Sequence, residues 1–207
     1  MAHEFSVGDR VSLSPEADPP LFTVGHSNRE LDEFIGLLEQ SSVEAVVDVR
    51  KLPGSRRYPW FDAPVLEAAL AERGIGFSRI EALTGRRPVN REVPFEVNAW
   101  WENRSFHNYA DHALSEGFRD ALAELRSVGS QRRTAVMCSE AVWWRCHRRI
   151  IADHLLAAGD EVQHILGPGQ VKPAELSAGA VVGAGGEVTY PMGVLAAPAK
   201  GGEGRIP

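Results

Sequence analysis

Thr134-Ala-Val-Met-Cys-Ser-Glu-Ala-Val-Trp-Trp-Arg-Cys-His-Arg-Arg-Ile150 is the stretch of the 207-residue chain that best indicates its fold. A short apolar segment ends at Cys138, and amphipathic spacing predicts a helix over residues 145–158. A buried strand that leads through a polar loop into a helix is typical of an α/β protein. Both cysteines of the chain, Cys138 and Cys146, lie in this stretch. The stretch therefore indicates a functional site as well as a fold.

The same alternation recurs along the chain. Apolar segments predict further strands over 21–24, 44–49, 75–80 and 161–166, and amphipathic spacing predicts further helices over 27–40, 64–74 and 105–128. Ser27 followed by Glu30 is a capping box for the first of these helices. The last is either one long helix or, as the alternative, two shorter ones broken near Gly117. Strands that alternate with helices predict a three-layer α/β sandwich with a mainly parallel sheet of about five strands.

Composition divides the chain into three parts. We expect a flexible N-terminal segment over 1–20, an α/β domain over 21–167, and a Gly/Ala/Pro-rich extension over 168–207. The extension is compatible with a hairpin around Gly183-Ala-Gly-Gly186, followed by a disordered tail.

Composition also restricts the compartment and the partners. The N-terminus lacks the apolar core of a signal peptide, and no run is long enough to cross a membrane, so no membrane partner is expected. Two cysteines do not make a disulfide framework, which favours a reducing, cytoplasmic location. The formal net charge of −6 argues against a general nucleic-acid coat. The sequence does not predict an oligomeric state.

Polar side chains follow three of the predicted strands. They are His26 and Ser27 after the first strand, Asp48, Arg50, Ser55 and Arg56 after the second, and Cys138, Glu140, His147 and Arg148 after the fourth. In an open parallel sheet, ligands bind outside the carboxyl ends of the strands. The coincidence of three such strand ends therefore predicts one shared crevice.

Four short segments within these strand ends carry a resemblance. Val24–Ser27, Val47–Arg56, Cys138–Glu140 and Cys146–Arg148 resemble the signatures of the domain of unknown function 488 family. The similarity extends over about residues 22–166 and includes Leu83-Thr-Gly-Arg-Arg87, in which the family commonly has glycine in place of Thr84. The resemblance implies a small α/β domain of bacteria and archaea and no settled activity. The Trp143-Trp144 loop and the tail from Pro168 are this chain's own variation.

The leading functional hypothesis is an enzyme that acts on a phosphorylated or nucleotide-like anion. Guanidinium groups match phosphate or carboxylate bidentately, so the predicted anion-binding residues are Arg50, Arg56 and Arg148, helped by Ser27, Ser55 and His147. The predicted catalytic residues are His26, Asp48 and Glu140 for acid/base chemistry, with Cys138 as a candidate nucleophile. The alternative for Arg50 is an ion pair with Asp48 or Glu140.

The two cysteines have structural alternatives. Cys138 is placed like a nucleophilic thiol between a strand and a helix. However, Trp144 stands where a phosphatase loop needs arginine, and Glu140 in the loop would repel a phosphate dianion, so a small buried apolar role is favoured for Cys138. Zinc bound by both cysteines, His147 and His26 is a further alternative. Neighbours on a helix point about 100° apart, so Cys146 and His147 on the predicted helix would not face one ligand. Because the Cys-x-x-Cys spacing is also missing, we predict no metal and no cofactor.

Two non-catalytic interpretations stand beside the enzyme. The first is a nucleic-acid or nucleotide binding module that uses the basic loops 50–57 and 86–87 together with the tryptophans; the net negative charge counts against it. The second is a regulatory or interaction domain in which the motif residues form an internal network of ion pairs and hydrogen bonds.

Overall fold

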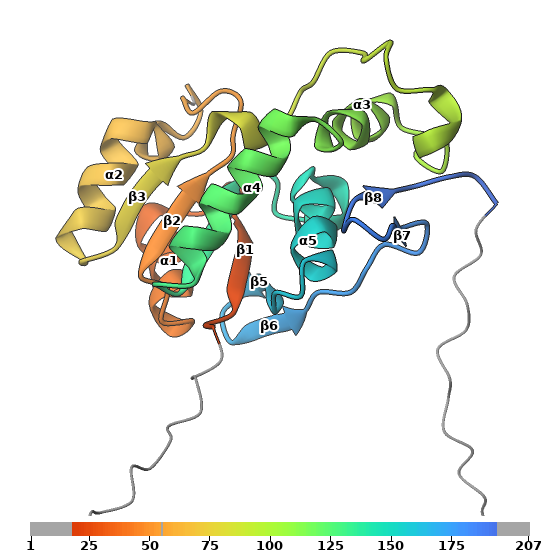
Figure 1. Ribbon diagram of the computed structural model, residues 1–207. Coiled ribbons are helices and arrows are strands. Elements are labelled where there is room, and N and C mark those ends of the chain that lie inside the picture. The colour runs from red at the N-terminus through yellow and green to blue at the C-terminus, as the bar shows by residue number, and fades with distance from the viewer. Residues whose placement is uncertain (1–17, 55, 194–207) are drawn as a thin grey trace, which may run out of the picture.

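A six-stranded sheet forms the centre of the computed structural model, which describes residues 18–54 and 56–193 (Figure 1). The strands are β1 (Leu21–Gly25), β2 (Ala45–Asp48), β3 (Gly76–Arg79), β4 (Thr134–Cys138), β5 (Val162–Gly167) and β6 (Gln170–Pro173), in the order β3-β2-β4-β1-β5-β6. The first five strands are parallel, and β6 pairs antiparallel with β5. The predicted fold class is confirmed. All four residues of β6 are exposed, and so an apolar pattern did not reveal this sixth strand.

Helices cover both faces of the sheet (Figure 1). On one face, α1 (Leu31–Gln40) and α2 (Ala63–Glu72) pack on alternate residues of the strands, such as Val24, Val46 and Met137. On the other face, α3 (Arg104–Ala113), α4 (Glu116–Gly129) and α5 (Arg148–Ala157) pack on the intervening residues, such as Val47 and Val136. Successive side chains of a strand point to opposite faces of the sheet. Alternate residues of each strand therefore contact different helical layers.

The first helix begins later than the capping box predicted. Its N-cap is Glu30, which makes no side-chain capping bond, and the helix starts at Leu31. Ser27 instead has a left-handed backbone (φ 55°), and its hydroxyl donates to Asn28 Oδ1. The capping box was therefore wrong, because the backbone of Ser27 is tied to the loop that follows β4 rather than to the helix: its N–H donates to the Ser139 carbonyl at 2.9 Å.

The predicted helix 145–158 also begins later, at Arg148. Trp143–Arg145 form a separate 3-10 turn, η4, closed by a bond from the Cys146 N–H to the Trp143 carbonyl. Cys146 is then extended, with φ −128° and ψ 146°, and His147 is the N-cap of α5. Cys146 therefore does not have the helical geometry on which the separation of Cys146 and His147 was argued.

The predicted helix 105–128 is two helices, as its alternative allowed. The break falls at 114–115, two residues before Gly117, because the Ser115 side chain accepts from the Phe118 N–H and caps α4. The longest helix in the described part of the chain is α4, with 14 residues. None of the described helices has the length and apolar character needed to cross a bilayer.

The segment after the sheet packs against α5. Strands β7 (Val181–Val182) and β8 (Val188–Thr189) pair antiparallel. Tyr190 is buried, and its hydroxyl donates to Asp153 Oδ2 of α5 at 2.8 Å, while the Ser177 N–H donates to Asp153 Oδ1 at 2.8 Å. The predicted boundary between the α/β domain and the extension, at residue 167, remains a prediction. The predicted flexible N-terminal segment up to residue 17, Ser55 and the tail from 194 lie outside the described residues.

Candidate functional site at the strand ends

The topology brings the three predicted strand ends together. Strand β4 lies between β2 and β1 and is parallel to both, with Asp48 beside Met137 and Gly25 beside Cys138. The loops after β1 and β4 are joined by a bond from the His26 N–H to the Cys138 carbonyl at 3.0 Å. The residues predicted from strand ends thus lie at one edge of the sheet.

Gly25 allows the loop after β4 to approach β1. A Cβ at this position would lie 1.9 Å from the Glu140 carbonyl oxygen, so no other residue fits without moving backbone. The same carbonyl accepts from an Arg148 guanidinium N–H. The loop that carries Glu140 is therefore fixed from both sides.

On the α1/α2 side of this edge, Asp48, Arg50 and His26 form a closed network, here called the Asp48–Arg50–His26 network. Arg50 Nε and Nη2 donate to the Asp48 carboxylate at 3.0 and 2.8 Å, and Arg50 Nη1 donates to the Phe61 carbonyl at 2.8 Å and to His26 Nε2 at 3.3 Å. Both charged groups are buried. A guanidinium has five N–H donors, and this network uses four of them. The ion pair that was the alternative for Arg50 is present, and Arg50 cannot present a bidentate fork to a ligand.

His26 is neutral in this network. Its Nδ1 donates to the Ser27 carbonyl at 2.9 Å, which leaves Nε2 as the acceptor for Arg50. The ring stacks on Phe61 at 4.1 Å. Burial, with the nearby Arg50 charge, lowers the pKa of His26 to about 4. Every polar atom of the ring is engaged inside the fold.

On the α3/α5 side, a cavity of about 350 Å³ opens at the same edge; it is called the strand-end cavity here. Its cationic lining residues are Arg50, Lys51, Arg86 and Arg145. Its other polar lining residues include Asn103, Ser105, Tyr109, Glu140 and the three residues Cys138, Cys146 and His147. The cavity thus combines an excess of positive charge with thiol and imidazole groups.

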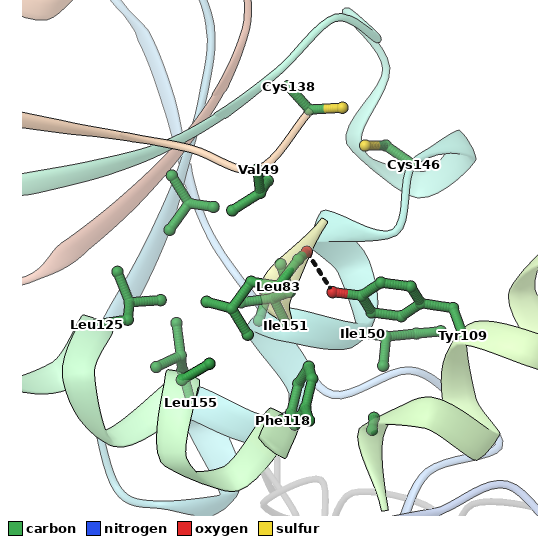
Figure 2. Close-up of a cluster of buried hydrophobic side chains, with 14 of the residues drawn as sticks. Val49, Leu83, Tyr109, Phe118, Leu125, Cys138, Cys146, Ile150, Ile151 and Leu155 are labelled. Carbon is green, nitrogen blue, oxygen red and sulfur yellow. Dashed lines mark hydrogen bonds between the residues drawn. The ribbon is translucent and has the colours of Figure 1, made fainter. Parts of the chain in front are cut away.

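Cys138, Cys146 and His147 form a compact group, called the Cys138–Cys146–His147 cluster. Their two Sγ atoms and the His147 Nδ1 all lie within 4.8 Å of one another. Nδ1 lies 4.0 Å from Cys138 Sγ and 3.6 Å from Cys146 Sγ. Figure 2 shows the two sulfur atoms turned toward each other, Cys138 from the end of β4 and Cys146 from the turn before α5. The extended backbone of Cys146 makes this convergence possible.

The orientation of His147 is fixed by its surroundings. Its Nε2 donates to the Val49 carbonyl at 3.1 Å, so the lone pair of the neutral ring is on Nδ1, which faces the sulfurs. Tyr109 packs against the ring at 4.9 Å, and its hydroxyl donates to the Leu83 carbonyl. Gly85 covers another side, where a Cβ would lie 2.9 Å from Nδ1. A larger residue at position 85 would displace the imidazole.

The two thiols differ in their electrostatics. A hydrogen bond from the Cys138 thiol lowers the pKa of Cys146 well below its ordinary value; burial opposes this shift, and the nearby Arg148 charge adds to it. The same bond, together with burial, raises the pKa of Cys138. Arg148 Nε donates to Cys146 Sγ at 3.3 Å. Cys146, rather than Cys138, is therefore the sulfur that carries negative charge more readily.

The cations at the cavity rim are less engaged than Arg50. Lys51 Nζ lies 3.9 Å from an exposed Glu81 carboxylate. Arg86 and Arg145 are exposed, and neither side chain has a hydrogen bond or ion pair to a residue in the described ranges 18–54 and 56–193. Arg86 also has a left-handed backbone, with φ 57°. These two guanidinium groups are available to a ligand.

The structure separates the predicted site residues into two groups. Arg50, Cys138, Glu140 and His147 line the strand-end cavity, whereas the lining does not include His26, Ser27, Asp48, Arg56 or Arg148. Arg148 is buried behind the cluster, and Arg56 is exposed in the loop after β2. The predicted site Ser55 falls outside the described residues.

Sequence reasoning missed several cavity residues. They are Gly85, Asn103, Ser105 and Tyr109; Arg145 was given no role, Lys51 and Arg86 were named only for the nucleic-acid alternative, and Cys146 only for the zinc alternative. One signal was legible: Asn103 stands at the start of α3 and caps it by accepting from the Ser105 N–H at 2.9 Å. The sequence pattern placed Cys146 on the face of a helix. The side chain points into the cavity because the preceding 3-10 turn leaves its backbone extended.

Part of the surface proposed for nucleic acid is used inside the fold. Arg149 lies over the rings of Trp100, Trp101 and Trp143, 5.4, 5.0 and 5.9 Å from their centroids. Arg87 donates to main-chain carbonyls of the turn η2 (Glu81–Leu83) and of the residue after it. These contacts do not favour the nucleic-acid alternative.

Similarity to known proteins comes from a family model. No curated protein and no solved structure matches the chain. The model described as "Domain of unknown function DUF488" matches residues 30–155, which include Asp48, Arg50 and the whole Cys138–Cys146–His147 cluster. Because the match covers more than half of the 207 residues, the chain belongs to the Domain of unknown function DUF488 family.

Proposed function

We propose that the protein is an enzyme that binds an anionic small molecule, phosphorylated or nucleotide-like, in the strand-end cavity. One observation carries the proposal: a single cavity is lined by the cations Arg86 and Arg145, which have no side-chain partner among the described residues, and by the Cys138–Cys146–His147 cluster. Cavities of a few hundred Å³ suit small-molecule ligands. Binding groups and reactive groups in one cavity are what a group-transfer or hydrolytic enzyme needs.

The anion is assigned to the rim of the cavity. Arg86 and Arg145 can each offer a guanidinium fork, and Lys51 adds a third positive charge. Arg50 has one free N–H left, and Arg148 is buried with bonds to Cys146 and Glu140. A local positive field in a chain of net charge −6 concentrates anions at this one place.

The reacting part of the ligand is assigned to the floor of the cavity. The cluster supplies two thiols and an imidazole nitrogen, and Glu140 adds an exposed carboxylate that can exchange protons. The Asp48–Arg50–His26 network has a positioning role in this scheme. It holds the end of β2, whose next residue, Val49, provides the carbonyl that orients His147.

Isothermal titration calorimetry with phosphate, pyrophosphate, AMP and ATP tests the proposal. We expect the wild-type chain to bind one of these anions, with affinity that falls as salt screens the rim charges. Arg86→Ala combined with Arg145→Ala should weaken binding about a hundredfold or more, because each of the two lost charge-assisted bonds contributes about 1.5–3 kcal/mol. Arg119→Ala, an exposed arginine of α4 outside this cavity, is the matched control.

Turnover of the bound anion is then followed by phosphorus NMR and by chromatography of the nucleotide. Release of phosphate or base that Cys146→Ser abolishes would support the enzyme. A wild-type chain that binds none of the four anions, or binding that the double arginine variant leaves unchanged, would contradict the proposal.

A further inference from the structure

We propose that Cys138, Cys146 and His147 hold one thiophilic divalent metal ion, such as zinc, with its fourth coordination position open to the strand-end cavity. The inference goes beyond the proposed function, because metal binding is measured without a substrate.

The first argument is the spacing of the donor atoms. Zinc binds sulfur at about 2.3 Å and imidazole nitrogen at about 2.0–2.1 Å, so a tetrahedral ion separates its donors by roughly 3.5–3.8 Å. Here Nδ1 lies 3.6 Å from one sulfur and 4.0 Å from the other, and all three donors lie within 4.8 Å of one another. The two nitrogen–sulfur separations are within a few tenths of an ångström of these values, and the two sulfurs need to approach each other by at most about 1 Å to surround an ion.

The second argument is the direction of the imidazole. His147 Nε2 donates to the Val49 carbonyl, and Nδ1 therefore presents a lone pair to the sulfurs. An anchored N–H on one ring nitrogen and a free lone pair on the other is the arrangement of metal-binding histidines. Gly85 and Tyr109 hold the ring in this place.

The third argument concerns charge. Two thiolates balance the charge of a divalent cation, so the three ligands and the ion are together neutral. Arg148 Nε donates to Cys146 Sγ at 3.3 Å, as outer-shell groups do toward a ligating thiolate. Soft sulfur ligands select zinc and similar metals over calcium and magnesium, which prefer oxygen.

The fourth argument is the open side. All three ligand residues line the strand-end cavity, together with the cations of its rim. Structural zinc sites have four protein ligands, whereas catalytic ones have three and leave a position for water or substrate. Three ligands at the floor of an anion-sized cavity therefore fit a site where an anionic ligand meets the ion.

Metal content of the full chain is the test. The chain is purified under reducing conditions without a histidine tag, loaded with zinc, dialysed and measured by plasma mass spectrometry. We expect about one zinc per chain, and less than about a tenth of that in Cys146→Ser and in His147→Ala. His26→Gln, a histidine whose Nε2 faces Arg50 instead of the cluster, should keep the wild-type amount. Circular dichroism reports whether each variant folds.

A second measurement needs no variant. Cobalt in place of zinc should give the near-ultraviolet absorption of a cobalt–thiolate bond, and both thiols of the wild-type chain should resist a thiol reagent until a chelator removes the metal. Reduced wild-type chain that retains no zinc overturns the site, as does zinc that neither Cys146→Ser nor His147→Ala releases. A chain that binds zinc but none of the anions contradicts the proposed function alone, and anion binding without zinc contradicts the metal site alone.

Discussion

The two sides of the strand-end edge use similar residue types in opposite ways. On the α1/α2 side, Asp48, Arg50 and His26 satisfy one another, and only one N–H of the guanidinium remains. On the α3/α5 side, the cluster and the rim cations face a cavity, and Arg86 and Arg145 have no partner within the described ranges. The difference teaches that polar residues at strand ends divide according to the sheet face they meet. Closed networks hold the edge, and open ones can meet a ligand.

The largest loss of stability is expected when the centre of the closed network is removed. Arg50→Ala leaves the Asp48 carboxylate fully buried without its main partner. Breaking one partner of a buried ion pair costs about 3–5 kcal/mol of the free energy of unfolding. Urea denaturation measures the loss, with Arg145→Ala as the control that should change stability by less than about 0.5 kcal/mol. Equal midpoints for the two variants would contradict the distinction between the sides.

Acid should weaken the closed side through His26. Its pKa is about 4 in the folded chain and 6.5 in the unfolded chain, so between these values the unfolded chain binds the extra proton. Stability is therefore complete above pH 6.5, falls as the pH drops toward 4, and loses about 3 kcal/mol at most from this residue. Arg50, Asp48 and Arg148 are the charged groups that act on it.

Denaturant midpoints between pH 4 and 7 measure this dependence. Burial also lowers the pKa values of His154 and His164 to about 4, so the wild-type slope contains their contributions as well. His26→Gln should reduce the slope of the free energy of unfolding against pH by the contribution of one titrating histidine. An unchanged slope, or a His26 ring that NMR shows to be protonated in the folded chain at pH 5.5, would refute the assignment.

Gly85→Ala should damage the open side more than it damages the fold. The new Cβ would lie 2.9 Å from His147 Nδ1, and the ring must leave the position in which Nε2 bonds the Val49 carbonyl. We expect a stability loss of about 1–2 kcal/mol from this overpacking and a larger relative loss of ligand and zinc binding. Gly36→Ala in α1, where nothing lies within 4 Å of the added atom, should instead be neutral or stabilising. Wild-type binding by Gly85→Ala would show that His147 does not need its present position.

The smallest effect on stability is expected at the rim. Arg86→Ala and Arg145→Ala remove exposed side chains without partners among residues 18–54 and 56–193, so the midpoint of unfolding should change by less than about 0.5 kcal/mol. These two substitutions should instead lower the affinity for an anion. If the double variant unfolds as readily as Arg50→Ala, the rim cations are structural and the contrast between the two sides disappears.

The sequence was sufficient for the strands and for their meeting point. Segments such as Thr134–Cys138 are short, apolar and followed by polar residues, and that pattern depends on local chemistry alone. The parallel order then placed the ends of β1, β2 and β4 together. Strand β6 was not predicted, because an exposed edge strand does not need an alternating apolar pattern.

The division of labour at the site could not be read from the sequence. Whether Arg50 faces Asp48 or a ligand depends on where Phe61 and His26 place their acceptors, which is a tertiary fact. The direction of Cys146 depends on a 3-10 turn that ends one residue before it, and helical spacing alone continued the helix through it. The ligand role predicted for Arg50 and the helical position predicted for Cys146 were wrong for the same reason: contacts with residues distant in sequence decide both.

The bond between Tyr190 and Asp153 bears on which piece of the chain can fold. The family match runs from 30 to 155, yet β1, the strand between β4 and β5, lies before it, and β5 and Tyr190 lie after it. A fragment cut to the match would lose an inner strand of the sheet and the residues that hold the outer side of α5. The span that is recognisable by similarity is thus shorter than the span that makes a folding unit, and a fragment meant to keep the cluster intact must extend at least from Leu21 to Tyr190.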